Sequence, residues 1–483
     1  MYLKEGLTNI VSEGQVVDDY MALKETVNNH CFVKGGIPGC LVRPQNLGEV
    51  QKIIQWANEK KIPVTPISSG EPHLRGDSVP TYGGIAMDLR NLNKVITADR
   101  RYRVAMVEPG VTFYQLKKEL NGVGLRLPMP LSPRKSKSVL GSVLEREPIT
   151  IPKYHIDMSA PLLCVEVVFG TGDIFRTGEA SGPGTIEEQW EAGRKQKWDS
   201  GPGQVSYVRF IQGAQGGLGV VTWATLRCEV LPTQREFLFI PGESIEDFIG
   251  FVYGILRLKL GDECFILNGS NAASLLQGGA DFRLLREELP PWLLVLGISG
   301  YEIFPEERIS YQKNEILNIA SQFGLLPKPS ISGISAKRLL ESLEEPSEPY
   351  WKLKPKGASC DIFFLTTLDK VSKFISLMYQ ISNDHRYDIR DLGIYVQPIQ
   401  QGRSCHCEFN LIYDPNDLKE VDKIKKLFSI ASRAMMKEGG FFSRPYGSWA
   451  QMAYNKDAGS REAVRNLKKI FDPNNIMNPG KLC

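Results

Sequence analysis

The sequence has little cysteine and almost no surplus of either charge. Nine cysteines in 483 residues are too sparse for a disulfide scaffold, and Cys405 and Cys407 lack the spacing of a C-x-x-C redox or zinc motif. Lysine and arginine number 58 against 55 acidic residues, well below the basic excess of a typical nucleic-acid-binding protein. We therefore expect neither a nucleic-acid partner nor a metal site.

Long apolar runs are absent as well. No window reaches the roughly 18 apolar residues that a membrane-spanning helix needs, and residues 1–6 lack the basic and apolar regions of a signal peptide. These absences predict a cytoplasmic protein without a membrane span. A hydrophobic fraction of 42% excludes a disordered chain, and the length allows two to four domains. The class that remains is a multidomain globular protein, most often an enzyme.

Helical and strand-like patterns alternate over residues 1–235. Apolar residues at helical spacing predict a helix over 46–61, and a short strand follows over 62–67. Thr112 is placed to cap the helix that begins after it. The segment 164–177 predicts a β-hairpin around a Gly-Thr-Gly turn.

The pattern changes over residues 236–440. Apolar strand-like runs alternate there with amphipathic helices, which is typical of an α+β domain built on an antiparallel sheet. The predicted strands lie at 237–240, 292–297 and 362–365, and the helices at 244–258, 305–323 and 415–437. Residues 181–205, rich in glycine and proline, predict a long loop.

A glycine-containing loop over residues 68–76 follows the strand at 62–67. Glycines allow left-handed backbone conformations and let backbone N–H groups approach a ligand closely. From the residues alone, this loop fits a plain surface turn equally well.

Five segments, in this order, resemble the FAD-dependent oxidoreductases of the vanillyl-alcohol oxidase and p-cresol methylhydroxylase (4-cresol dehydrogenase) type. They are residues 66–80, 107–112, 141–146, 165–178 and 471–481. The resemblance implies a two-domain α+β fold, with an FAD-binding domain over 1–235, completed by 441–483, and an α+β cap (substrate) domain over 236–440. It also implies an enzyme that transfers hydride from its substrate to flavin N5.

The resemblance assigns the cofactor site to the first domain and the tail. Backbone N–H groups of the 68–71 segment would bind the pyrophosphate, and Lys481 would place a cation near the N1–C2=O edge of the flavin. Composition alone instead favours an exposed C-terminal lysine. The expected cofactor-binding residues are Pro66, Ile67, Ser68, Ser69, Gly70, Glu71, Pro109, Gly110, Ser142, Val167, Gly219, Val220 and Lys481.

Two positions that bind a phenolate in the phenol-oxidising relatives differ here. The tyrosine of their pyrophosphate loop is replaced by Arg75, and their Tyr-Arg pair reads Ser443-Arg444. Two converging arginines suit a carboxylate, because the planar guanidinium pairs with both of its oxygens. The alternative is that Arg75 turns outward or binds the FAD phosphates.

Two histidines are candidate bases. An ungapped match puts His155 where relatives have an aspartate beside the flavin, with Asp157 as the rival, and His406 matches a pocket-facing histidine. Either could take a hydroxyl proton as hydride leaves. Arg403 and Glu408 could be no more than solvated neighbours of His406.

Some relatives tether FAD through His or Tyr on the strand that matches 357–364, where this chain has Asp361. We therefore expect dissociable FAD, with His73 as the alternative tether. The expected substrate is an alcohol, a hydroxy acid or a para-substituted phenol. A metal-ligating His-x-His signature, as in the hydroxy-acid branch, is not evident around His406.

Electrons would leave to oxygen, a quinone, or a cytochrome or iron–sulfur partner, because the sequence has no cysteine set for its own cluster. We expect a homo-oligomer, a dimer in the simplest case. The alternative function is a non-catalytic or electron-relaying flavoprotein subunit of a larger redox complex.

Overall fold

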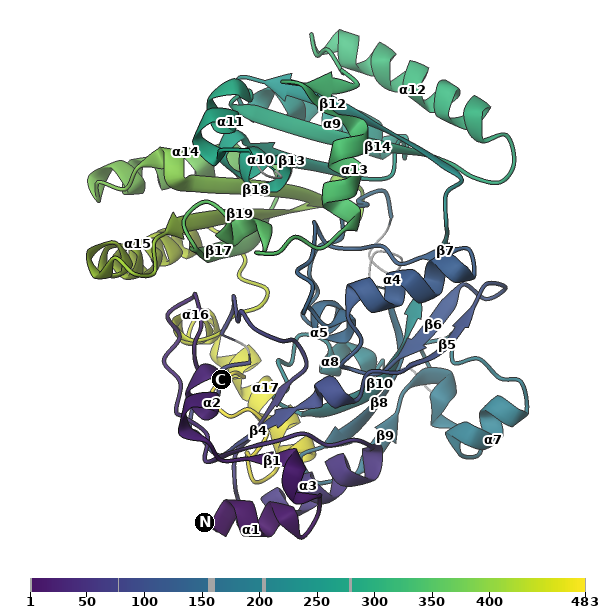
Figure 1. The fold of residues 1–483 in the computed structure, drawn as a ribbon, viewed down its shortest axis with the longest axis vertical. Coiled ribbons are helices and arrows are strands. Elements are labelled where there is room, and N and C mark those ends of the chain that lie inside the picture. The colour runs from purple at the N-terminus through teal and green to yellow at the C-terminus, as the bar shows by residue number, and fades with distance from the viewer. Residues whose placement is uncertain (1, 77, 155–160, 202–205, 278–279, 483) are drawn as a thin grey trace.

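The chain folds into two domains, which lie one above the other in Figure 1. The computed structural model describes residues 2–76, 78–154, 161–201, 206–277 and 280–482. The lower domain holds the N-terminal elements and the C-terminal helix α17 (Ala458–Phe471), and the upper domain is the cap. This arrangement confirms the expected two-domain α+β fold.

A four-stranded sheet forms the outer part of the lower domain. Its order is β1 (Val16–Val17), β2 (Cys40–Val42), β4 (Ile85–Asp88) and β3 (Val64–Ile67), with β2, β4 and β3 parallel. The predicted helix is α3 (Leu47–Lys60), which Asn46 caps by accepting a hydrogen bond from Glu49 N–H. The short helix α1 (Tyr2–Thr8) precedes β1 in the chain, and α2 (Tyr20–Glu25) lies between β1 and β2.

A five-stranded antiparallel sheet forms the rest of this domain, in the order β5 (Val95–Asp99), β6 (Val104–Val107), β10 (Gly219–Arg227), β8 (Leu162–Phe169) and β9 (Ile174–Arg176). β8 and β9 are the predicted hairpin. Thr112 accepts a hydrogen bond from Gln115 N–H at the start of α4 (Phe113–Gly122), as predicted. Short helices α5 (Val139–Leu144) and α8 (Val208–Ile211) complete it.

The prediction of one long loop over 181–205 is wrong in part. Helix α7 (Ile186–Glu191) begins there, because Thr185 and Glu188 form a reciprocal capping box at its N-terminus. These two hydrogen bonds satisfy the backbone N–H groups of Thr185 and Glu188. The glycine- and proline-rich residues on either side led to the prediction of a loop.

The tail joins the first domain beside β3. Val64 N–H donates to Ile476 O at 2.7 Å, and Asn478 N–H donates to Val64 O at 2.8 Å. Earlier in the tail, Phe442 and Trp449, the latter on α16 (Ser448–Tyr454), pack into the apolar core of the cap. The boundaries at 235/236 and 440/441 stay a prediction.

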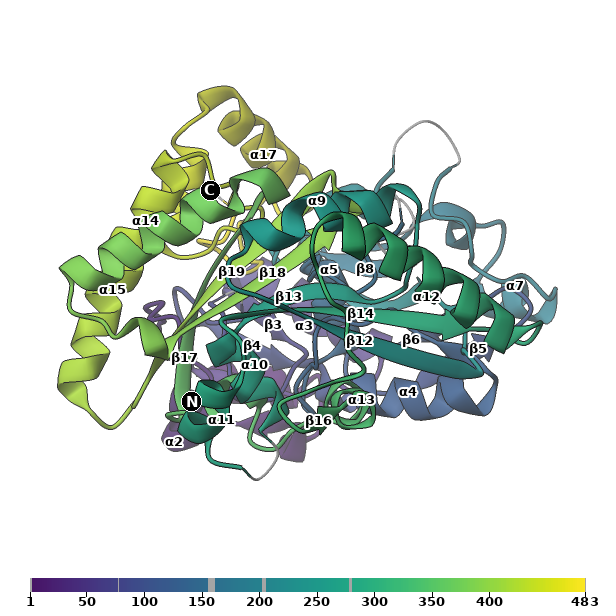
Figure 2. The same ribbon diagram turned by 90° about the horizontal axis from the view of Figure 1, so that it is seen from above.

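The cap is built on the predicted antiparallel sheet, whose six strands Figure 2 shows from above. Their order is β12 (Gln234–Gly242), β14 (Trp292–Gly300), β13 (Cys264–Asn268), β18 (Leu392–Ile399), β19 (Ser404–Tyr413) and β17 (Ala358–Thr366). One face packs against α9 (Glu246–Arg257), α12 (Pro305–Gln322), α14 (Val371–Asp384) and α15 (Leu418–Lys437). The other packs against α10 (Gly269–Leu276), α11 (Phe282–Glu288) and α13 (Ala336–Glu344).

Within the described parts of the chain, no helix combines the length and apolar character that crossing a membrane requires.

Candidate active site

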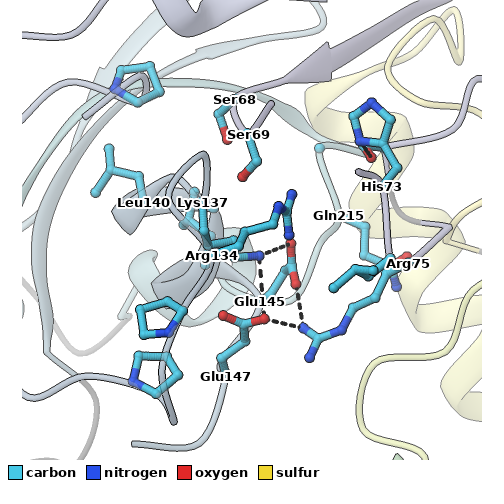
Figure 3. Close-up of a pocket in the computed structure, with 18 of the residues that line it drawn as sticks. Ser68, Ser69, His73, Arg75, Arg134, Lys137, Leu140, Glu145, Glu147 and Gln215 are labelled. Atoms are coloured by element: carbon cyan, nitrogen blue, oxygen red, sulfur yellow. Dashed lines mark hydrogen bonds and ion pairs between the residues drawn. The ribbon is translucent and has the colours of Figure 1, made fainter. Parts of the chain in front are cut away.

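A cavity lies where the two domains meet, with an empty volume of about 1570 Å³ that is partly open to solvent. Residues of both domains line it: the loop after β3, the 130–148 segment and the start of β10 on one side, and strands of the cap on the other. Ligand pockets form preferentially at such domain interfaces. Figure 3 shows part of its lining.

The first-domain wall contains about half of the expected cofactor-binding residues. Those that line the cavity are Pro66, Ser68, Ser69, Pro109, Val167, Gly219 and Val220, whereas Ile67, Gly70, Glu71, Gly110, Ser142 and Lys481 are outside the lining. The backbone N–H of Gly70 donates to Ser136 O at 3.0 Å, and Ser69 Oγ accepts from Ser138 N–H at 3.0 Å. The loop after β3 is thereby fixed against the residues that lead into α5.

Glycines bring the walls of the cavity close together. A Cβ on Gly141 would lie 3.0 Å from Ser68 Oγ, and one on Gly219 would lie 2.4 Å from Val168 O. Gly219 needs to be glycine because the backbone of the neighbouring strand touches it, whereas at Gly141 the near atom is the Ser68 hydroxyl. The result is a cradle of backbone and hydroxyl groups. The Gly70 N–H, however, was expected to bind the pyrophosphate and instead donates to Ser136 O, and the position of the pyrophosphate stays a prediction.

Arg75 extends into the cavity and forms ion pairs there (Figure 3). Its Nη1 lies 2.8 Å from Glu145 Oε2 and 2.5 Å from Glu147 Oε1, and Lys137 Nζ lies within 3.4 Å of both carboxylates. Burial raises the pKa of Glu147, but the charges of Lys137 and Arg75 outweigh it and hold that pKa well below its ordinary value. The alternative in which Arg75 turns outward is therefore wrong.

Arg444 lies against the same aromatic ring as Arg75. The guanidinium carbons of Arg444 and Arg75 are 4.3 and 4.8 Å from the ring centroid of Phe363. Arg444 is only 5% exposed, and its Nε and Nη1 have no hydrogen-bond partner among the described residues. Burial, reinforced by the charge of Arg75, lowers the pKa of Arg444 to about 10. Although Arg444 is outside the cavity lining, the two predicted arginines do converge.

His406 lines the cavity from β19 and is 1% exposed. Its Nε2 lies 3.1 Å from Glu408 Oε2, and its Nδ1 has no partner within the described ranges. Burial lowers the pKa of His406 despite the nearby Glu408 carboxylate, so the ring is neutral at pH 7. Glu408 is buried as well, so the reading of Glu408 as a solvated neighbour is wrong, whereas Arg403 is exposed.

The remaining predicted site residues lie in different settings. His155 and its rival Asp157 fall outside the described residues. His73, the alternative tether, lines the cavity and is 5% exposed. Lys481 is 1% exposed and donates to Gly76 O at 2.6 Å, which contradicts the exposed lysine that composition favours. Its expected position at the flavin edge stays a prediction.

Several charged residues of the lining were missed from the sequence. They are Arg134, Lys137, Glu145, Glu147 and Lys352. Glu145 and Glu147 pair with Arg75, which is 70 and 72 positions away in the chain, and Lys352 pairs with Glu408, 56 positions away. No local pattern marks such contacts. No group of three potential His, Cys, Asp or Glu metal ligands occurs in the part of the chain that the structure describes.

Two family models match the chain. The FAD binding domain model matches residues 38–178, and the model of the C-terminal domain of FAD linked oxidases matches residues 363–482. The chain is 23% identical to D-2-hydroxyglutarate dehydrogenase of Stutzerimonas stutzeri, over 99% of this chain and 98% of that protein. It is 22% identical to the mitochondrial D-lactate dehydrogenase [cytochrome] of Arabidopsis thaliana, over 92% and 73%.

A shorter match links the chain to the phenol-oxidising branch. The 4-cresol dehydrogenase [hydroxylating] flavoprotein subunit of Pseudomonas putida is 30% identical over 200 residues, 41% of this chain and 36% of that protein. The structure of p-cresol methylhydroxylase with substrate bound superimposes with a TM-score of 0.82 at 19% identity, over 99% of this chain and 96% of that one. The structure of 4-ethylphenol oxidase from Gulosibacter chungangensis gives the same TM-score at 20% identity, over the same shares. The chain is therefore an FAD-dependent oxidoreductase and belongs to the vanillyl-alcohol oxidase and p-cresol methylhydroxylase family of FAD-linked oxidases.

Proposed function

We propose that the protein oxidises the hydroxyl group of a small 2-hydroxy acid and passes the hydride to FAD. The observation that carries this proposal is the buried guanidinium of Arg444, in which two nitrogen atoms have no hydrogen-bond partner among the described residues. A buried cation of this kind is costly unless a ligand pairs with it. A carboxylate supplies two oxygens in the geometry of the guanidinium fork.

Arg444 lies next to a cavity lining in which the charges of the protein cancel. Among the described residues of the lining, four cationic side chains face four carboxylates, and the formal charges cancel. The cations are Arg75, Arg134, Lys137 and Lys352, and the carboxylates are Glu145, Glu147, Asp361 and Glu408. Arg444, next to this set, adds one positive charge that a substrate carboxylate would balance.

The residues of the cavity fit FAD, because the glycine cradle on the first domain and the unpartnered polar atoms on the cap side leave both walls ready for a ligand. FAD, when bound, supplies a two-electron acceptor for the substrate hydride. Arg444 then binds the substrate carboxylate, and Arg75, paired with Glu145 and Glu147, lies against the same Phe363 ring. Nδ1 of the neutral His406 ring, which has no hydrogen-bond partner in the described part of the chain, takes the hydroxyl proton.

We also propose that FAD is held without a covalent bond. Asp361 stands at the tether position of some relatives, and its carboxylate lies 2.7 Å from Lys352 Nζ. A carboxylate engaged in this way is a poor nucleophile. Acid precipitation of the yellow protein should release all of the flavin to the supernatant. Flavin retained in wild-type pellet but released by a His73→Ala variant would instead identify His73 as a tether.

Comparison of the relatives also favours a hydroxy acid over a phenol. The relatives named as D-lactate and D-2-hydroxyglutarate dehydrogenases match more than nine-tenths of this chain, whereas the 4-cresol dehydrogenase match covers 41%. Both phenolate-binding tyrosines of the phenol branch are replaced here, by Arg75 and Ser443. The replacement of these tyrosines removes two phenolic hydrogen-bond donors and introduces the guanidinium of Arg75.

Anaerobic mixing of the FAD-loaded protein with single compounds tests the proposal. D-Lactate, glycolate and D-2-hydroxyglutarate represent one class and p-cresol the other, and loss of flavin absorbance is the readout. Reduction by at least one hydroxy acid, and none by p-cresol, is expected. Reduction by p-cresol alone would contradict the proposal, and no reduction by either class would favour the electron-relaying subunit. Reoxidation by oxygen, a quinone or a cytochrome would then identify the electron acceptor.

A further inference from the structure

One face of the cap sheet carries polar side chains at the cavity. Residues alternate between the two faces of a strand, so Asp361 and Phe363 on β17 share a face with their partners Asn410 and Glu408 on β19. His406 is two residues from Glu408 and lies on the same face. The opposite face carries apolar side chains such as Cys407, which pack into the core of the cap.

A buried ion cluster occupies this face. Lys352 Nζ lies 2.7 Å from Asp361 Oδ2 and also contacts Glu408 Oε1. Asn410 Nδ2 donates to Asp361 Oδ1 at 2.7 Å and to Glu408 Oε1 at 2.8 Å. Asn271 Nδ2 fixes the other end of this amide by donating to Asn410 Oδ1 at 2.7 Å. The members of the cluster are 1–7% exposed, so their positions are set by one another rather than by water.

This cluster decides which nitrogen of His406 carries the proton. Burial opposes ionisation of Glu408, but Lys352 and His406 outweigh it and hold the pKa of Glu408 well below its ordinary value. An ionised carboxylate only accepts hydrogen bonds. Since Glu408 Oε2 lies 3.1 Å from His406 Nε2, that nitrogen must donate. Nδ1 of the neutral ring is then left with its lone pair and without a partner among the described residues.

The charge of the cluster also suits a proton acceptor. One ammonium, Lys352, faces two carboxylates, Asp361 and Glu408, so the cluster has a formal charge of −1. A proton on His406 would make it neutral. Arg75 and Arg444 face His406 from the other side and oppose that proton, until a bound carboxylate screens them.

We propose that Glu408 and Lys352 are positioning residues of a buried proton relay, in which Glu408 holds Nε2–H of His406 and so presents Nδ1 to the substrate hydroxyl. This inference rests on the proposed function for the identity of the substrate, but not for the state of His406. As the alcohol is oxidised, its C–H bond breaks and the hydride goes to FAD. The O–H bond breaks as well, its proton passes to Nδ1, and the C=O bond forms. His406 becomes a cation that Glu408 stabilises.

The tautomer and pKa of His406 can be measured without any substrate. The FAD-loaded protein is labelled with ¹⁵N-histidine, and its five histidines give resolvable ring-nitrogen signals, of which His406 is assigned by its loss in His406→Gln. We expect wild-type His406 to carry its proton on Nε2 at pH 7 and to titrate below its ordinary pKa. A proton on Nδ1 at pH 7 would overturn the proposal with no variant needed.

Two variants separate a relay from a merely structural cluster. Glu408→Gln removes a negative charge and should move the titration midpoint of His406 to lower pH. Lys352→Met removes the positive charge from the two carboxylates and should move the midpoint to higher pH. Midpoints that shift in the same direction, or do not shift, would overturn the proposal.

The failure of this inference is distinguishable from that of the proposed function. A hydroxy acid that reduces the flavin while His406 is protonated on Nδ1 would reject the relay and keep the function. The opposite result is that His406 carries its proton on Nε2 and the two variants shift its titration midpoint in opposite directions, but no hydroxy acid reduces the flavin. That result would support the relay and reject the proposed function.

Discussion

Charged and polar groups at the cavity differ in whether other residues of the protein pair with them. On the first-domain side, Arg75 is paired with Glu145 and Glu147, so its guanidinium is neutralised within the protein. Arg444, on the C-terminal tail, and His406, on the cap strand β19, are more deeply buried and keep polar atoms without a partner among the described residues. The comparison teaches that burial alone does not mark a ligand-binding group. What marks it is burial without a partner in the protein.

Replacement of Arg444 should have the largest effect on catalysis. Arg444→Ala removes two charge-assisted hydrogen bonds to the substrate, which together contribute about 3 kcal/mol or more, so kcat/KM should fall about 100-fold. Steady-state turnover of the best hydroxy acid measures this, with the bound FAD content as control. Arg444→Lys should recover only part of the loss, since an ammonium cannot pair with both oxygens in one plane. Unchanged turnover with full FAD content would refute the role of Arg444.

Substitution of Arg75 should lower the free energy of unfolding, whereas substitution of Arg444 should raise it. Arg75→Ala removes the ion pairs to Glu145 and Glu147 and should lower the free energy of unfolding by about 3 kcal/mol, since breaking a buried pair strands a charge. Arg444→Met removes a buried cation whose Nε and Nη1 have no hydrogen-bond partner among the described residues, and should raise the free energy of unfolding by about 1 kcal/mol. Denaturant unfolding of the proteins without substrate measures both changes.

The double variant Arg75→Ala with Glu147→Gln is the matched control for the first change. It should restore part of the lost stability, because fewer carboxylates are then stranded. Equal destabilisation by Arg75→Ala and Arg444→Met would contradict the proposed difference between Arg75, which is paired with carboxylates, and Arg444.

The sequence predicted local features of this fold well and long-range contacts poorly. Helix α3 and the cap at Thr112 follow from spacing and chemistry within one turn. The pairing of Arg75 with Glu147 joins residues 72 positions apart, and no local pattern encodes it. Resemblance to a family brought His406 and Arg444 to attention, but only the structure shows that His406 Nδ1 and two nitrogens of Arg444 lack hydrogen-bond partners within the described ranges.

The pH dependence of turnover should reflect the buried, neutral His406. Its pKa is lowered from the ordinary value of 6.5, and the neutral ring is the active base. Turnover should therefore be nearly constant above pH 6.5 and fall about tenfold per pH unit once pH drops below the lowered pKa.

The contribution of His406 to the free energy of unfolding should also decrease as pH falls, as turnover does. Because the unfolded chain binds the proton more readily than the folded one, this contribution is present above pH 6.5 and is lost as pH falls through the lowered pKa. Comparison of wild type with His406→Gln across this range isolates the residue. A wild-type acid limb above pH 6.5 would contradict the proposed environment of His406.

The smallest effect concerns a residue remote from the charged groups. Thr112→Ala removes the N-cap of α4 and should lower the free energy of unfolding by about 1 kcal/mol without changing kcat/KM. Thr112→Ser, which keeps the capping oxygen, serves as its control. A loss of activity in the alanine variant at full FAD content would mean that α4 contributes to the site.

Binding of oxalate tests the central claim most directly, because this dicarboxylate carries no C–H bond from which hydride could leave. Titration calorimetry of the FAD-loaded wild type and of Arg444→Met gives the dissociation constant without any chemistry. We predict that oxalate binds the wild type and that the substitution weakens binding about 100-fold. Equal affinity of oxalate for the two proteins would contradict the assignment of Arg444 as the anion-binding group.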